Sequence, residues 1–158
     1  MSEKIALPLN GGCQCGAVRY SITSAPVAYY WCHCTQCQRA SGSAFGESLR
    51  VRRADVQVRG TLGHWARITD AGTTTEVTFC PVCATRIWHT RPNAEFSHIR
   101  GGTLDDTSWL EPVAHIWARS RQPGVAVGPD ALVFEKQPSG LDAIVALWAD
   151  RMGSRFIP

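Results

Sequence analysis

The chain has 158 residues, 44% of them apolar, with 16 basic and 13 acidic side chains and a formal net charge of +3. This length suits one domain with a single core, and 18% of charged residues is too few for charge-driven disorder. The basic residues are scattered, so the charge does not argue for a nucleic-acid partner. We expect no membrane segment and no secretory signal either, which predicts a cytoplasmic protein.

Short segments with the character of β-strands recur along the chain. In residues 17–22, Val18, Tyr20 and Ile22 alternate with polar side chains, as in a half-buried strand. Further segments rich in Val, Thr and aromatic residues are bounded by Gly, Pro, Asp or Asn; they are 27–32, 44–51, 62–68, 73–79, 85–90, 95–100 and 114–119. Many short strands with few helices predict a mainly β fold of antiparallel sheets.

Two segments depart from this pattern. A short helical turn is predicted for residues 35–40. A longer helix is predicted for 138–153, where Ser139 and Asp142 have the spacing of a capping box. Five apolar side chains then fall near one helical face: Leu141, Ile144, Val145, Trp148 and Met152. We expect this helix to pack on its own sheet, with a homodimer contact as the alternative.

The seven cysteines are the most informative residues. In a reducing compartment such cysteines are metal ligands or catalytic groups more often than disulfides, and an odd number cannot pair completely. They form three groups: Cys13 and Cys15; Cys32, Cys34 and Cys37; Cys80 and Cys83. The Cys80-Pro-Val-Cys83 spacing is that of a zinc knuckle, which supplies two of four tetrahedral ligands.

The second pair of ligands for this knuckle has two candidate sources. If Cys13 and Cys15 provide it, every cysteine is used and the group at 32–37 remains intact. If two members of that group provide it, one cysteine is stranded and Cys13 and Cys15 lack partners. We therefore favour a structural zinc site of Cys13, Cys15, Cys80 and Cys83, which would join distant segments of the chain.

The remaining set, Cys32, Cys34 and Cys37, offers three thiolates from six consecutive residues. Three protein ligands and one open position are typical of catalytic zinc, and a substrate thiol suits the open position. A closed site with a histidine ligand and a redox role are the alternatives. His33 is badly placed for ligation, because its ring should point away from an ion that its neighbours share. The other histidines come from separate segments: His64, His89, His98 and His115.

Four motifs occur in the order of a known family. They are Gly-Gly-Cys-Gln-Cys-Gly-Ala-Val-Arg-Tyr (11–20), Cys-His-Cys-Thr-Gln-Cys-Gln-Arg-Ala-Ser-Gly-Ser-Ala-Phe (32–45), Phe-Cys-Pro-Val-Cys (79–83) and Gly-Thr-Leu-Asp-Asp (102–106). They resemble the glutathione-dependent formaldehyde-activating enzymes, or S-(hydroxymethyl)glutathione synthases, a family that includes centromere protein V. The resemblance spans residues 10–120. It implies a zinc-containing β-tent of short coiled antiparallel sheets. Because no repeat or linker divides the chain, we expect a single domain of residues 1–158 that ends in the helix at 138–153.

The same resemblance implies two zinc ions per chain. Cys13, Cys15, Cys80 and Cys83 match the family's structural ligands, and Cys32, Cys34 and Cys37 match its catalytic ones. It further implies a carbon–sulfur lyase in which a small-molecule thiol, glutathione in the founding activity, adds to formaldehyde. A noncatalytic zinc module that contacts protein or nucleic acid is the alternative function.

Two residues near the catalytic group are candidates for substrate binding. His33 is the local candidate for a proton carrier, and Arg39 is a candidate partner for a glutathione carboxylate. Asp105 and Asp106 are weaker candidates, because Asp in a Gly-flanked turn usually serves the turn.

The chain departs from the family pattern at two places. The family usually has Gly after the knuckle, where this chain has Ala84, so we expect a modified turn or local strain. A family Trp that follows the last strand is replaced by Gly124, which would alter the pocket if that Trp shapes it.

Overall fold

A computed structural model describes residues 3–69 and 72–158, and it shows a mainly β protein with two α-helices. The strands are β1 (Ile5–Ala6), β2 (Leu9–Gly12), β3 (Arg19–Ile22), β4 (Ala28–Cys32), β5 (Gly46–Arg52), β6 (Val56–Arg59), β7 (Gly63–Ile68), β8 (Thr74–Phe79), β9 (Arg86–Thr90), β10 (Phe96–Ile99), β11 (Ala114–Ile116), β12 (Leu132–Phe134) and β13 (Phe156–Ile157). The helices are α1 (Thr35–Ser41) and α2 (Asp142–Met152), with short 3₁₀ turns η1 (Arg53–Asp55), η2 (Gly101–Thr103) and η3 (Ala118–Ser120). In this part of the chain no helix is both long and apolar enough to cross a bilayer.

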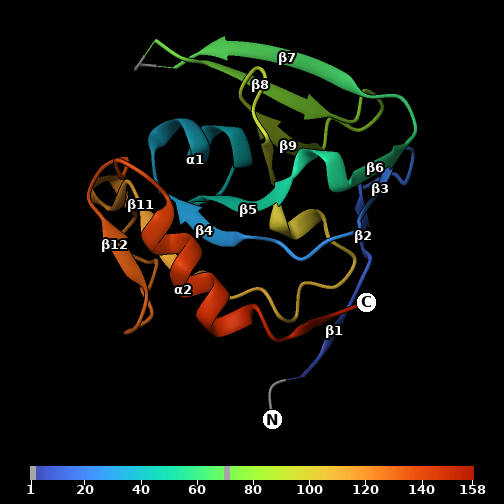
Figure 1. Ribbon diagram of the computed structural model, residues 1–158. Coiled ribbons are helices and arrows are strands. Elements are labelled where there is room, and N and C mark those ends of the chain that lie inside the picture. Colours follow the sequence, from blue (N-terminus) through green and yellow to red (C-terminus); the bar gives the residue numbers. More distant parts are fainter. Residues whose placement is uncertain (1–2, 70–71) are drawn as a thin grey trace.

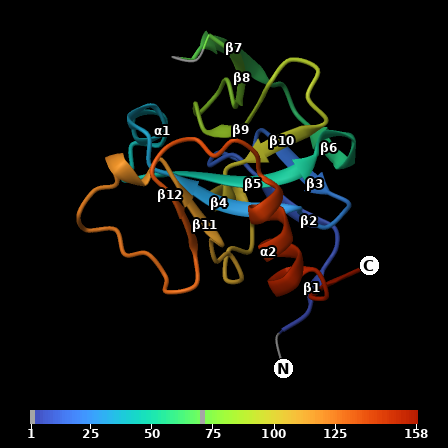
Figure 2. The same cartoon turned by 60° about the vertical axis from the view of Figure 1, so that its left-hand side comes forward.

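Eight strands form one sheet in the order β12-β11-β4-β5-β10-β9-β8-β7. Figures 1 and 2 together show this sheet, with β10 labelled in Figure 2. Strands β2, β3 and β6 form a second sheet, and β1 pairs with β13. From β4 to β7 every pairing in the large sheet is antiparallel, but β11 is parallel to both β4 and β12. The mainly β fold of antiparallel sheets is confirmed from β4 to β7, while the pairs of β11 with β4 and β12, and of β1 with β13, are parallel. Long connections before and after β11 (Figure 2) return the chain in the same direction, which a tight hairpin cannot do.

The buried faces of the strands follow the predicted alternation. Val18, Tyr20 and Ile22 are at most 2% exposed, while Arg19 and Ser21 between them are only half-buried. They belong to the hydrophobic core with Leu49 and Ile99 from the large sheet. The core thus fills the space between the three-stranded and the eight-stranded sheets, which is how both sheets bury one face.

Helix α2 packs on the large sheet through the apolar face that the sequence predicts. Ile144, Trp148 and Met152 are buried, and the helix contacts β4. The indole Nε1 of Trp148 donates a hydrogen bond to the carbonyl of Pro26 at 2.9 Å. The predicted capping box is wrong: the N-cap is Leu141, which makes no side-chain capping bond, and the helix begins at Asp142. Burial of one face, rather than a cap, holds α2 in place.

Replacing Trp148 with Ala tests whether α2 and the core at 10–120 unfold as one unit. Because Trp148 is 1% exposed, the cavity should lower the free energy of unfolding by about 3–5 kcal/mol. Chemical denaturation followed by far-UV circular dichroism should still show one transition. The exposed control Asp150→Ala should change the free energy little, whereas a second transition that reports α2 alone would contradict a single cooperative unit.

The turn between β8 and β9 contains a strained residue. Ala84 has φ 61°, in the left-handed region that glycine adopts without steric cost. Two backbone hydrogen bonds close the turn: Ala84 N donates to Cys80 O at 2.8 Å, and Cys80 N donates to Thr85 O at 2.9 Å. The local strain expected from the departure at Ala84 is confirmed.

Ala84→Gly should therefore stabilise the protein, in contrast to most alanine-to-glycine changes. We expect the free energy of unfolding to rise by about 1 kcal/mol, because relief of the left-handed strain exceeds the entropic cost of glycine. Ala66→Gly on the exposed face of β7 is the matched control, and it should destabilise. Denaturant titration of the two variants decides the matter: equal losses of stability would show that Ala84 carries no strain.

Candidate metal centres

Four cysteines from two distant turns meet at one point. Cys13 and Cys15 lie between β2 and β3, and Cys80 and Cys83 lie between β8 and β9. Their four Sγ atoms lie within 4.8 Å of one another. The Sγ–Sγ distance is 3.5 Å from Cys13 to Cys15 and 3.8 Å from Cys15 to Cys80. The structure thus brings together the four cysteines that counting had grouped.

The spacing of these sulfurs fits a tetrahedral metal ion. Zn–S bonds of about 2.3 Å require sulfurs about 3.8 Å apart in a tetrahedron. Backbone donors support the group, since Val18 N donates to Cys13 Sγ at 3.2 Å. Hydrogen bonds from the Thr85 hydroxyl, the Thr85 backbone and the Cys15 backbone lower the pKa of Cys83 to about 5. The donor set and its geometry can therefore hold a metal ion and are consistent with zinc.

The second sulfur group is local in sequence. Cys32 ends β4, Cys34 is the N-cap of α1, and Cys37 lies in the first turn of that helix. The cap itself sets the geometry, because Cys37 N donates to Cys34 Sγ at 3.3 Å. The three Sγ atoms lie within 4.8 Å of one another. Among the described residues, this group includes no histidine nitrogen and no carboxylate oxygen.

The three thiols compete for a single negative charge. Hydrogen bonds from Cys32 and then Cys37 lower the pKa of Cys34, and the bond to Cys34 raises the pKa of Cys32. For Cys37 the hydrogen bond to Cys32 lowers the pKa, but the bond to Cys34 and burial outweigh it, so the pKa is raised. A divalent cation removes this competition, because it binds each sulfur as a thiolate. The donor set therefore fits a metal ion with three protein ligands.

His33 lies between two of these cysteines in sequence but points away from them. The residue is 0% exposed, and its Nε2 lies 2.8 Å from Nδ1 of the buried His115. Its ring stacks on that of His115 and meets Phe45 edge-on. Burial, and then the charge of His115, lower the pKa of His33 to about 4. His33 is therefore a neutral packed group whose atoms do not reach the surface.

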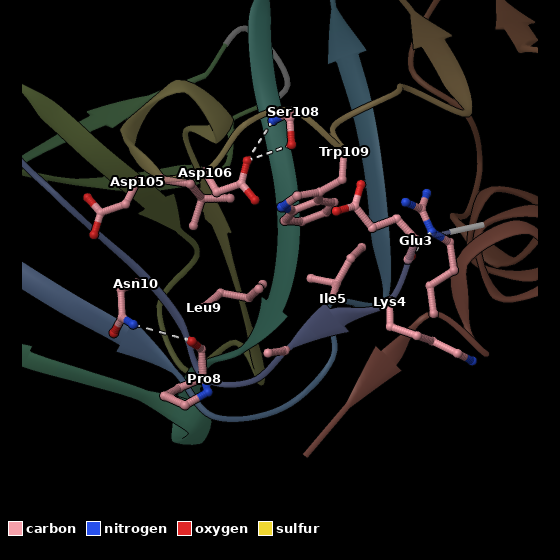
Figure 3. Close-up of a pocket in the computed structure, with 13 residues that line it drawn as sticks. Glu3, Lys4, Ile5, Pro8, Leu9, Asn10, Asp105, Asp106, Ser108 and Trp109 are labelled. Atoms are coloured by element: carbon pink, nitrogen blue, oxygen red, sulfur yellow. Dashed lines mark hydrogen bonds between the residues drawn. The ribbon is translucent and has the colours of Figure 1, made fainter. Parts of the chain in front are cut away.

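The other predicted binding residues lie apart from the sulfur groups or are used in the fold. Arg39 is exposed on α1. Asp105 forms an ion pair with Arg19, and Asp106 Oδ1 accepts hydrogen bonds from the Ser108 backbone at 3.0 Å and hydroxyl at 2.7 Å. Figure 3 shows both carboxylates at a cavity of about 280 Å³ that no cysteine lines.

Sequence reasoning missed the basic residues beside the three-cysteine group. Arg100 follows β10, and its Nη1 donates to the carbonyl of Glu47 at 3.2 Å. Arg86 begins β9, with its guanidinium 5.5 Å from the ring centre of Trp65. No motif marks these arginines, because they approach the cysteines only through the pairing of distant strands.

Comparisons with known proteins identify a matching family. The family model described as glutathione-dependent formaldehyde-activating enzyme matches residues 8–120. A Halomonas elongata protein named for the same enzyme is 32% identical over 85 residues, which cover 51% of this chain and 54% of that protein. The chain thus aligns with about half the length of this curated relative.

A solved structure of a Rhodobacter sphaeroides protein is also similar, with 20% identity and a TM-score of 0.49. The match covers 80% of this chain and 99% of that one. The family match is the decisive comparison, because it extends over more than half of the chain and includes all seven cysteines. The chain belongs to the glutathione-dependent formaldehyde-activating enzyme family.

Proposed function

We propose that this protein is a zinc-dependent enzyme that makes or breaks the carbon–sulfur bond between a small thiol, such as glutathione, and an aldehyde. The observation that carries this proposal is the group of Cys32, Cys34 and Cys37. It offers three convergent sulfurs, and among residues 3–69 and 72–158 no ligand atom of a further His, Cys, Asp or Glu joins the group. Three protein ligands leave one position for a substrate sulfur, whereas four close a site.

The chain holds these three ligands with different parts of its fold. Cys32 is fixed by the pairing of β4 with β5 and is 7% exposed. Cys34 and Cys37 are held by the start of α1, so the two are set relative to each other by helix geometry. A zinc ion bound there would lower the pKa of an added thiol and hold it close to an aldehyde carbon. Fixed ligands favour reaction because they restrict the approach of the two reactants.

The proposed reaction needs no oxidant or reductant. A bond forms between the thiol sulfur and the aldehyde carbon, the C=O double bond becomes a single bond, and the thiol proton ends on the oxygen. The reverse reaction breaks the carbon–sulfur bond and is that of a lyase. His33 is too buried to touch these atoms, so we assign it a positioning role through its contact with His115. Arg39 remains a candidate contact for a carboxylate at the exposed face of α1.

We assign the four-cysteine group a structural role. It joins the turn before β3 to the turn after β8, and Gln14 N also donates to Thr85 Oγ1 between these turns at 3.2 Å. Four thiolates saturate a tetrahedral ion and leave no position for substrate. Seven free thiols suit a reducing compartment, so we propose the cytoplasm as the site of action.

Single replacements in the two sulfur groups should have opposite effects. Cys83→Ser should lower the thermal stability strongly, because structural zinc contributes directly to folding. Cys37→Ser should remove one metal equivalent while the protein stays folded. Metal content by elemental analysis and melting curves by circular dichroism test this. Unfolding of Cys37→Ser would indicate a second structural site, and an unchanged melting curve of Cys83→Ser would refute the structural assignment.

The activity can be tested with glutathione and formaldehyde. Exchange between the free thiol and its hydroxymethyl adduct is followed by NMR exchange spectroscopy at equilibrium. The zinc-loaded protein should raise the exchange rate at least tenfold, and Cys37→Ser should return it to the uncatalysed rate. Thr35→Ala, an exposed change on the same helix, is the matched control and should retain the rate. Thiol binding without faster exchange would favour the noncatalytic module.

A further inference from the structure

Three arginines lie on the same face of the large sheet as the three-cysteine group. Directly opposed residues of antiparallel strands share a face, and so do residues two apart in one strand. On this basis Cys32, opposite Gly46, shares a face with Arg50, and Arg50 shares it with His98. Arg100, two residues after His98, belongs to the same face. The pairings His98–His89, His89–Val77 and Val77–Trp65 extend this face to β7.

Arg67 and Arg86 complete the set, which we call the arginine cluster (Arg67, Arg86 and Arg100). Arg67 is two residues after Trp65 on β7. A register shift between Thr78 and Phe79 places Arg86 opposite Phe79, two residues from Val77, and the Arg86 guanidinium accordingly lies over the Trp65 ring. Figures 1 and 2 show that α1 lies over β5 and beside β9, so the helix that carries Cys34 and Cys37 faces this part of the sheet. The cluster therefore borders the proposed substrate position.

Gly46 lies between Arg100 of the cluster and Cys37, so the space around it shows how close these two side chains are. A Cβ at Gly46 would lie 2.6 Å from Arg100 Nη1, 2.9 Å from Cys37 Cβ and 3.4 Å from Cys37 Sγ. The guanidinium and the thiol are thus within about 6 Å of each other, a range over which a cation stabilises an anion. Any larger residue at Gly46 would separate β5 from α1 or displace Arg100.

Among the described residues, no acidic side chain forms an ion pair with a member of the arginine cluster. The two ion pairs among residues 3–69 and 72–158 are Arg19–Asp105 and Arg52–Glu95, and neither includes a member of the cluster. All three arginines are half-buried. Burial, and then the charges of Arg100 and Arg67, lower the pKa of Arg86. Like charges held together without partners oppose folding, so an anionic ligand would remove a real electrostatic cost.

The spacing of the cluster favours two anionic groups over one. Arg86 and Arg100 lie on neighbouring strands, and Arg100 N donates to Ile87 O at 2.8 Å. Arg67 is on β7, two strands from β9, and Arg86 is level with Phe79 and Gly63, four residues before Arg67. The backbones of Arg67 and Arg86 are therefore separated by about 10 Å across the sheet and by about 13 Å along it. A planar guanidinium binds a carboxylate through two parallel hydrogen bonds. One carboxylate can meet Arg86 and Arg100, and a second can reach Arg67.

We propose that the arginine cluster is the subsite that selects a thiol with two carboxylates, and that it needs no ammonium group on the ligand. The inference rests on the proposed function for the thiol itself, but the carboxylate contacts do not require thiol chemistry. Substrate class is thereby set by charge: dicarboxylate thiols bind, neutral thiols bind weakly, and cationic thiols are repelled.

Three small probes separate the thiol from the carboxylates. Mercaptosuccinate carries a thiol and two carboxylates, succinate carries the carboxylates alone, and cysteamine carries a thiol and an ammonium group. Calorimetric titration of the zinc-loaded protein should give at least tenfold tighter binding of mercaptosuccinate than of cysteamine. Succinate should also bind, and its affinity should fall as salt is raised, because salt screens exposed charges.

Arginine variants then locate the subsite. Arg86→Gln should weaken both mercaptosuccinate and succinate at least fivefold without weakening cysteamine. Arg59→Gln is the matched control: Arg59 is an exposed arginine on β6 of the other sheet, and its loss should change no affinity by more than twofold. Because Arg100 also bonds Glu47, Arg100→Lys accompanies Arg100→Gln and should retain part of the affinity.

The outcomes distinguish this inference from the proposed function. If succinate affinity in Arg86→Gln and Arg100→Gln stays within twofold of the wild type, the arginine cluster is not a carboxylate subsite. If succinate binding depends on the arginines but neither thiol binds more tightly than succinate, the subsite stands and the thiol chemistry fails. If mercaptosuccinate and cysteamine bind equally well, charge does not select the substrate, and the proposal is overturned.

Discussion

The convergence of four sulfurs from two distant turns is the constraint on which the rest of this structure depends. Cys13 and Cys15 enter from the small sheet, and Cys80 and Cys83 enter from the large one, with all four Sγ atoms within 4.8 Å. Thiols this close repel as thiolates, so the arrangement is favourable only with shared protons or a bound cation. The strain at Ala84, in the turn that presents Cys80 and Cys83, is consistent with tight geometric demands at this junction. The two sheets then enclose the core between them.

The two cysteine groups differ in the elements of the fold that hold their sulfurs in place. The four-cysteine group is built from two turns, one between strands of the small sheet and one between strands of the large sheet. The three-cysteine group is built from one strand end and one helix start, Cys32 to Cys37, so the fold around it is held by β4–β5 pairing and by buried packing of His33 and His115. A site whose scaffold does not depend on its ligand can leave one position for substrate. This contrast, more than the count of sulfurs, is the physical basis for proposing different roles for the two groups.

Much of this arrangement could be predicted from local sequence, and the failures share one cause. Alternation predicted the buried face around Tyr20, and cysteine counting grouped the sulfurs as the structure does. The parallel pairing of β11 was missed because strand direction depends on long connections, which carry no periodic signal. The start of α2 was misplaced because packing of Trp148 and its neighbours, rather than a cap at Ser139, determines where that helix forms. Local sequence patterns reflect interactions between residues close in the chain, whereas the direction of β11 and the start of α2 depend on contacts between distant segments.

Local sequence patterns also failed to predict where the unpaired positive charges lie, as the arginine cluster shows. A net charge of +3 is mild and suggested no strongly basic surface. In the folded chain, however, Glu95 pairs with Arg52 and Asp105 with Arg19, both away from the three-cysteine group. Arg67, Arg86 and Arg100 come from separate strands and face the cysteines without a described acidic partner. The potential that a substrate meets depends on which charges remain unpaired at the site, and only the strand order determines that. A nearly neutral sequence can therefore fold with unpaired positive charges gathered beside one group of cysteines.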